Sequence, residues 1–121
     1  TIHIAIGNNP EKERYFDVEL MKNKIKELYK DENKINIILY NELTAEISKK
    51  LNANFILRGL RNTTDFEFEN SISQINKDIN KNLETVFLIT SPKLAPISST
   101  IIRDVVKYGG DINKYLPYKI N

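Results

Sequence analysis

Hydrophobic residues follow two different spacings along this chain, and the two spacings alternate. Short unbroken apolar runs predict β-strands at residues 2–6, 35–40, 54–58 and 85–90. Between and after them, apolar residues recur every three or four positions, as on one face of an amphipathic helix. These segments predict helices over about residues 17–30, 42–52, 64–81 and 98–108. The predicted order is therefore a β-α unit repeated along the whole chain.

The β-α alternation indicates a parallel sheet, because strands joined through a helix run in the same direction. Unbroken apolar strands are typical of a sheet that helices cover on both faces. We therefore expect a doubly wound, Rossmann-like α/β fold. A chain of 121 residues suits one hydrophobic core, so we expect one domain over residues 1–121.

Polar residues and glycines mark the expected helix ends. Thr64 and Glu67 have the spacing of a capping box, which predicts the start of the third helix there. The run Ser98-Ser99-Thr100 offers an N-cap for the last helix, and Gly109-Gly110 is a stop signal after it.

Composition excludes several classes of function. The net charge of +2 is too small to indicate general binding to nucleic acid or to a membrane surface. The chain has no cysteine, so disulfide and thiolate chemistry are excluded. No apolar run approaches the roughly 20 residues that a membrane-spanning helix needs.

Two arginines are the most specific candidates for chemistry. Lys and Arg together number 18, but only Arg14, Arg58, Arg61 and Arg103 are arginine. Arg58 and Arg61 stand three residues apart where the third strand is predicted to end. Ligands of open α/β sheets bind beyond the carboxyl ends of the strands, and the planar guanidinium holds phosphate through two hydrogen bonds. The pattern therefore predicts a phosphate-bearing substrate.

The start of the last helix is a second candidate for binding phosphate. A helix N-terminus offers free N–H groups to an anion, and Ser98, Ser99 and Thr100 add three hydroxyls there. A simpler interpretation is that one of these hydroxyls is only the N-cap. Both interpretations remain open from the sequence.

Acidic residues and the single histidine are weaker candidates. Asp65, Glu67 and Glu69 could act as a general base or as metal ligands, but acids in a first helical turn commonly just complement the helix dipole. Glu67 is expected to serve the capping box, whereas Glu69 could face the same pocket as Asp65. His3 lies inside a strand pattern, which favours a packed structural side chain over a catalyst.

Several of these segments together resemble a known family, the phosphopantetheine adenylyltransferases of the nucleotidylyltransferase superfamily. The similarity runs over nearly the whole chain, and its most specific part is Arg58-Gly59-Leu60-Arg61 followed by Asp65-Phe66-Glu67-Phe68-Glu69. The other matching segments are Asn9-Pro10-Glu11-Lys12, Phe16, Asn76, Val86-Phe87-Leu88, Ile97-Ser98-Ser99-Thr100, Gly110-Asp111 and Leu116-Pro117.

The resemblance implies a reaction and assigns residues to it. The phosphate of 4′-phosphopantetheine would attack the α-phosphorus of ATP, giving dephospho-coenzyme A and pyrophosphate, with Mg²⁺ accompanying ATP. The implied ligands of phosphopantetheine are Lys12, Leu43, Thr44 and Arg58. The implied ligands of ATP are Arg61, Glu69, Ser98, Ser99 and Thr100. The resemblance also implies a cytoplasmic homohexamer. We expect no nucleic-acid or membrane partner, because the net charge is small, and no metal ligand among the protein's own residues.

The chain departs from the family pattern at its start. The family begins with a strand, a Gly-rich turn containing Thr, and a His-x-Gly-His motif, and none of these is present here. We therefore assign no catalytic residue, and we expect the first β-α unit to be missing from this chain. A missing first strand is expected to leave a gap in the sheet with unpaired backbone groups.

Two other functions remain open. One is a different nucleotidylyltransferase, of the nicotinate-mononucleotide or glycerol-phosphate type, although the Arg-Gly-Leu-Arg element argues against it. The other is a non-catalytic nucleotide-binding or assembly domain, which the absent histidines favour.

Overall fold

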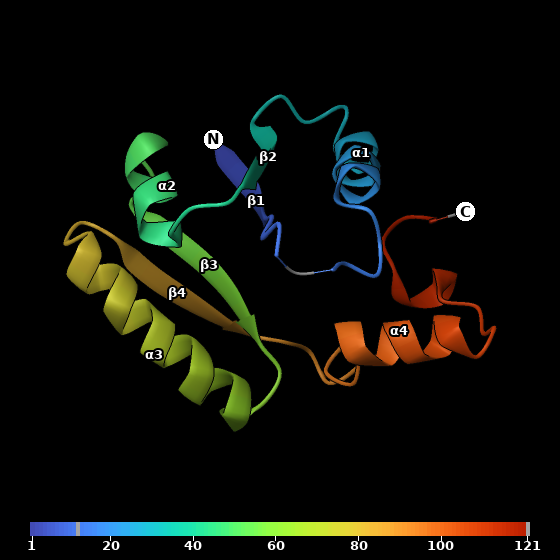
Figure 1. The fold of residues 1–121 in the computed structure, drawn as a ribbon. Coiled ribbons are helices and arrows are strands. Elements are labelled where there is room, and N and C mark those ends of the chain that lie inside the picture. Colours follow the sequence, from blue (N-terminus) through green and yellow to red (C-terminus); the bar gives the residue numbers. More distant parts are fainter. Residues whose placement is uncertain (12, 121) are drawn as a thin grey trace. The chain divides into compact units, whose positions relative to one another are not determined.

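A computed structural model describes residues 1–11 and 13–120 of the chain (Figure 1). Strands and helices alternate as predicted. They are β1 (Ile2–Gly7), α1 (Val18–Leu28), β2 (Ile35–Tyr40), α2 (Thr44–Lys50), β3 (Phe55–Leu60), α3 (Thr63–Ile79), β4 (Glu84–Ile89) and α4 (Ser99–Lys107), followed by a short 3₁₀ turn at Asn113–Tyr115.

The strands pair in parallel, as the β-α alternation predicts. β1 pairs with β2, with Ile2 opposite Ile35, and β3 pairs with β4, with Phe55 opposite Glu84. In the part of the chain that the structure describes, these pairs form two separate sheets of two strands each. The mixed α/β class with parallel strands is confirmed, and it fits a Rossmann-like fold.

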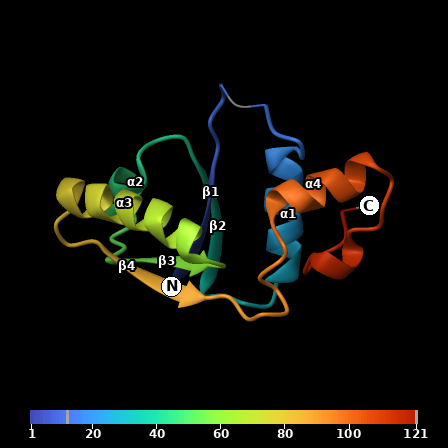
Figure 2. The same cartoon turned by 90° about the horizontal axis from the view of Figure 1, so that it is seen from below.

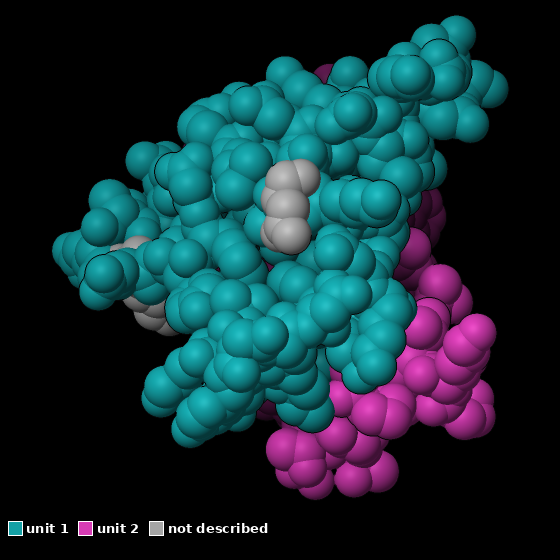
Figure 3. Space-filling view, turned by 90° about the vertical axis from the view of Figure 1, so that its right-hand side faces the viewer, with its two compact units in different colours: residues 1–41, 98–121 teal, residues 42–97 magenta. Residues whose placement is uncertain are grey.

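The chain divides into two compact units, which Figure 3 colours separately. One unit comprises residues 1–41 and 98–121, and it holds β1, α1, β2 and α4. The other comprises residues 42–97, and it holds α2, β3, α3 and β4. The expectation of a single domain stays a prediction.

Within residues 42–97, α3 packs along one face of the β3–β4 sheet (Figures 1 and 2). Phe66 of α3 meets Phe87 of β4 edge to face, with ring centroids 5.8 Å apart. Side chains alternate between the two faces of a strand, so Phe55 and Leu57 project from the opposite face. They are 70% and 65% exposed. Within residues 42–97, Phe55 and Leu57 therefore lie on the face of the sheet that α3 does not cover.

Tight packing in this unit joins α2 to the end of α3. Ala45 and Leu83 are almost completely buried. Beside them, the buried Asn80 side chain donates a hydrogen bond to the Ser48 hydroxyl at 3.1 Å, and Ser48 donates to the Ala45 carbonyl at 2.7 Å. Because each buried polar group has a partner, this contact avoids the cost of an unsatisfied donor or acceptor.

Within the other unit, α1 packs against β2. The helix begins after Asp17, whose carboxylate accepts the Leu20 backbone N–H at 2.8 Å. In the same unit, Ile102 of α4 and Ile112 are buried. Among the described residues, none of the helices combines the length and the apolar character that a crossing of a membrane requires.

Both ends of α4 follow the sequence prediction. At its start, the Ser98 hydroxyl accepts the Ile101 backbone N–H at 3.2 Å, so Ser98 is the N-cap. At its end, Gly109 has a φ of +77° and donates to the Val106 carbonyl, while Gly110 donates to the Val105 carbonyl. This pair of bonds is a Schellman motif, in which the left-handed position favours glycine.

We expect Gly109→Ala to destabilise the protein by about 1–2 kcal/mol, because a Cβ is strained in the left-handed conformation. Nothing lies within 4 Å of the position of that Cβ, so the loss would come from backbone strain and not from a steric clash. Gly109→Asn is the matched control and should lose less, because asparagine tolerates this conformation better. Chemical denaturation measures both, and equal losses would contradict the prediction.

The N-cap gives a second prediction about stability. Ser98→Ala should cost about 1 kcal/mol because the Ile101 N–H loses its acceptor. Ser99→Ala is the matched control: Ser99 is the first residue of α4, and its replacement leaves the cap intact. Urea denaturation of the two variants measures the difference, and a loss at Ser99 as large as that at Ser98 would refute the assignment of the cap.

Candidate functional site

Arg58 lies inside β3, opposite Phe87 of β4, and not in the loop that follows the strand. The strand continues to Leu60, whose carbonyl accepts the Thr90 backbone N–H at 2.8 Å. The predicted strand end at Arg58 is therefore wrong by two residues. A charge followed by glycine resembles a loop in sequence, but pairing with β4 extends the strand through both residues.

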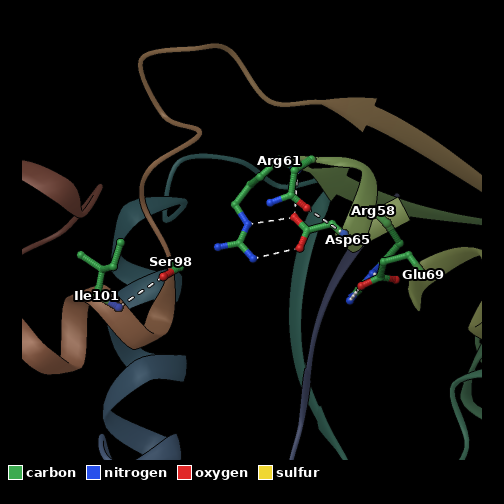
Figure 4. Close-up of polar contacts among 7 residues, drawn as sticks. Arg58, Arg61, Asp65, Glu69, Ser98 and Ile101 are labelled. Carbon is green, nitrogen blue, oxygen red and sulfur yellow. Dashed lines mark hydrogen bonds and ion pairs between the residues drawn. The ribbon is translucent and has the colours of Figure 1, made fainter. Parts of the chain in front are cut away.

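Arg58 forms an ion pair with Glu69 of α3 (Figure 4). Its Nε donates to Glu69 Oε2 at 2.8 Å, and its Nη2 donates to Glu69 Oε1 at 2.5 Å. The Glu69 side chain is 13% exposed and that of Arg58 is 51% exposed. The structure thus brings together two residues that the family resemblance assigned to different substrates.

Arg61, directly after β3, forms a similar pair with Asp65 (Figure 4). Its Nε and Nη2 donate to the two carboxylate oxygens of Asp65, each at 2.9 Å. The Arg61 backbone N–H donates to the same carboxylate at 2.9 Å. The side-chain hydrogen bond from Arg61 lowers the pKa of Asp65, and the same contact raises the pKa of Arg61.

The sequence did not identify Asp65 as a partner of Arg61. Asp65 and Glu69 were open as a general base or as metal ligands, but in the structure each carboxylate binds an arginine. Within the described residues, no set of three or more His, Cys, Asp or Glu side chains could hold a metal ion. The signal available in the sequence was the Arg-Asp spacing of four residues, which suits a pair at the start of a helix.

The capping box predicted for α3 is wrong. The helix begins at Thr63, one residue before the expected cap, and Asn62 is the N-cap. The Asn62 side chain accepts the Asp65 backbone N–H at 2.9 Å. Asparagine is as good an N-cap as serine, and the short distance from β3 favours the earlier start. Glu67 therefore does not have the capping role expected of it.

At the start of α4, the structure places Ser98, Ser99 and Thr100 on consecutive residues at the helix N-terminus. Ser98 is the cap, and the Thr100 hydroxyl accepts a hydrogen bond from Arg103 at 3.3 Å. This arrangement confirms the simpler interpretation for one of the three hydroxyls. Phosphate binding by the three stays a prediction.

The remaining candidate residues belong neither to the two ion pairs nor to the start of α4. Leu43 is the N-cap position of α2 and is 61% exposed, and Thr44 is the first residue of that helix. Lys12 lies outside the described residues. His3 lies in β1 opposite Asn36, and its Nδ1 is shielded from solvent without a hydrogen-bond partner among the described residues.

The lowered pKa of Asp65 gives a prediction about pH. A carboxylate with a depressed folded-state pKa stabilises the protein above its ordinary pKa, here 3.8, and this stabilisation is lost as the pH falls through the lower folded value. The stability difference between the wild-type protein and Asp65→Asn should therefore stay constant from neutral pH to about pH 5 and then shrink at lower pH. Denaturation at a series of pH values measures it.

The same substitution made in an Arg61→Gln background is the control for this pH series. Without the guanidinium, the carboxylate of Asp65 loses the side-chain hydrogen bond that is the largest cause of its lowered pKa, but it keeps the hydrogen bond from the backbone N–H of residue 61. The pH-dependent difference should then become smaller, and an unchanged difference would show that another group causes it.

Comparison with known proteins identifies the family of the chain. The Cytidylyltransferase-like family model matches residues 2–105. The phosphopantetheine adenylyltransferase of Cytophaga hutchinsonii is 55% identical over 117 residues, which cover 97% of this chain and 78% of the relative.

Two further relatives carry the same name. The phosphopantetheine adenylyltransferase of Flavobacterium psychrophilum is 49% identical, and that of Bacteroides thetaiotaomicron is 40% identical. Each of these alignments covers 96% of this chain and 76% of the relative. The chain belongs to the phosphopantetheine adenylyltransferase family.

Proposed function

We propose that this protein transfers the adenylyl group of ATP to 4′-phosphopantetheine in the biosynthesis of coenzyme A. The observation that carries the proposal is the 55% identity to a phosphopantetheine adenylyltransferase over 97% of the chain. A phosphate oxygen of phosphopantetheine forms a bond to the α-phosphorus of ATP, and the bond from that phosphorus to the bridging oxygen of pyrophosphate breaks. The products are dephospho-coenzyme A and pyrophosphate, so the atoms balance without a covalent enzyme intermediate.

Arg58 and Lys12 are proposed to hold the phosphate of phosphopantetheine. Both are cations, and a dianionic phosphate competes well for a guanidinium that already binds a carboxylate. The Arg58 side chain is 51% exposed, so a phosphate can approach it although Glu69 occupies one side. Leu43 and Thr44, at the start of α2, are proposed to contact the pantetheine arm.

Arg61, Glu69 and the α4 hydroxyls are proposed ligands of ATP. Arg61 donates to a phosphate, and Glu69 contacts the nucleoside. At the start of α4, the cap role and the phosphate role are compatible for Ser98. Its oxygen accepts the Ile101 N–H, while its own O–H is a donor that a phosphate oxygen can accept. Ser99 and Thr100 add two more hydroxyls beside the positive end of the helix dipole.

Charge stabilisation is the chemistry that these residues supply. Negative charge moves onto the pyrophosphate as it leaves, and donors already oriented toward the phosphates stabilise that charge without reorganising. Mg²⁺ is proposed to arrive with ATP as part of the substrate. Assembly as a homohexamer and a cytoplasmic location are proposed from the family resemblance. The absence of nucleic-acid and membrane partners is proposed from the small net charge and from the lack of a long apolar run.

The direct test is to incubate the intact protein with ATP and 4′-phosphopantetheine and to measure dephospho-coenzyme A and pyrophosphate in equal amounts. Nicotinate mononucleotide and glycerol phosphate replace phosphopantetheine in parallel reactions. Turnover with one of these acceptors alone would assign a different nucleotidylyltransferase. Binding of nucleotide without any turnover would favour the non-catalytic alternative.

Arg58→Lys should weaken the binding of phosphopantetheine although it keeps the charge. A lysine cannot reproduce the planar two-point contact. Losing one hydrogen bond to a charged group costs roughly 1.5–3 kcal/mol, or about a 10- to 150-fold loss of affinity. The thermal midpoint should change little, because exposed ion pairs contribute at most about 1 kcal/mol to stability.

Calorimetric titration with phosphopantetheine measures the effect of Arg58→Lys. The matched control is Arg14→Lys, which makes the same chemical change at an exposed residue outside the proposed site. Unchanged affinity in Arg58→Lys would remove Arg58 from the phosphate site.

A further inference from the structure

The pair between Asp65 and Arg61 uses only one edge of the guanidinium. The Asp65 carboxylate accepts hydrogen bonds from Nε and Nη2, which form the side-on edge of the guanidinium. The end-on edge consists of Nη1 and the second N–H of Nη2, and among the described residues Nη1 has no hydrogen-bond partner. The planar group can therefore bind a carboxylate on one edge and a phosphate on another at the same time.

The carboxylate of Asp65 is itself held in place. It accepts the Arg61 backbone N–H at 2.9 Å in addition to the side chain. Its own residue is fixed in the first turn of α3, because the Asp65 N–H donates to the Asn62 side chain at 2.9 Å. The Asp65 side chain is only 20% exposed. These bonds join the end of β3 to the first turn of α3, and they hold the guanidinium of Arg61 in one orientation.

We propose that Asp65 is a positioning residue for adenylyl transfer, which orients the guanidinium of Arg61 so that its end-on edge meets a phosphate of ATP. This inference rests on the proposed function, in which Arg61 is a ligand of ATP. Asp65 touches neither substrate and acts through Arg61 alone.

Two physical effects of Asp65 oppose each other, which makes the role testable. Its negative charge reduces the attraction of the site for ATP, so an electrostatic role alone predicts that removing the charge tightens binding. Its hydrogen bonds order the Arg61 side chain before ATP binds. Without them, the loss of side-chain entropy on binding would weaken the affinity for ATP. The Arg61 side chain is 36% exposed and that of Asp65 is 20% exposed, so solvent partly screens the negative charge, and the ordering effect should dominate.

Asp65→Asn should therefore raise the KM for ATP by about two- to tenfold, which corresponds to about 0.4–1.4 kcal/mol. The KM for phosphopantetheine should stay unchanged. Asp65→Glu keeps the charge and should recover part of the loss. Asp78→Asn is the matched control, because Asp78 also lies on α3 and loses an ion pair, with Lys81, on the same substitution. It should leave both KM values unchanged.

A double-mutant cycle on the intact protein decides whether Asp65 acts through Arg61. If it does, Asp65→Asn adds no further loss once Arg61→Ala is present. Additive losses, equal losses for the two substrates, or tighter ATP binding in Asp65→Asn would each overturn the positioning role. Thermal midpoints of all variants identify a loss that comes from unfolding.

The cycle also separates this inference from the proposed function. If Arg61→Ala weakens ATP and Asp65→Asn does not, the positioning role is wrong and the assignment of Arg61 stands. If Arg61→Ala leaves the KM for ATP unchanged, then Arg61 is not an ATP ligand and the positioning role is overturned with it.

Discussion

Parallel pairing of β3 with β4, continued in register to Leu60, is the constraint on which the candidate site depends. Because the pairing includes Arg58, the pleat of the strand directs that side chain to the face that α3 covers. Because the strand ends at Leu60, Arg61 is the first residue after it, and α3 begins only two residues later. Both arginines are therefore brought beside the first two turns of the same helix.

Two carboxylates in the first two turns of α3 form ion pairs with these arginines. Asp65 and Glu69 are four residues apart, so they lie on one side of the helix. Each uses both oxygens for one guanidinium, which a lysine ammonium could not match. Ion pairs whose arginine is exposed to solvent, as in both pairs here, add little to stability. Their main effect is to restrict the orientations of two long side chains.

The start of α4 carries three hydroxyls, and one of them has a structural role. A helix N-terminus has backbone N–H groups that lack partners inside the helix. Ser98 satisfies one of them, and an anion is a suitable ligand for the N–H groups at such a terminus. A residue can thus stabilise the helix and still contribute a donor to a ligand, so a capping role does not argue against a binding role.

The sequence by itself determined the order of strands and helices, the parallel pairing and the glycine stop after α4. These features depend on local patterns: apolar spacing, the conformational freedom of Gly109 and the connection of strands through helices. The sequence also identified Arg58 and Arg61 as the residues of interest, because arginine is scarce in this chain.

Only the tertiary structure decided where β3 ends, which residue caps α3 and which carboxylate binds each arginine. Arg58 and Gly59 have the character of a loop until β4 lies beside them, so the strand end is a property of two segments and not of one. Glu69 is eleven residues from Arg58 in sequence, a spacing that indicates no contact until α3 packs on the sheet. Long-range packing selects among several locally acceptable hydrogen-bond partners, and that choice is absent from the local pattern.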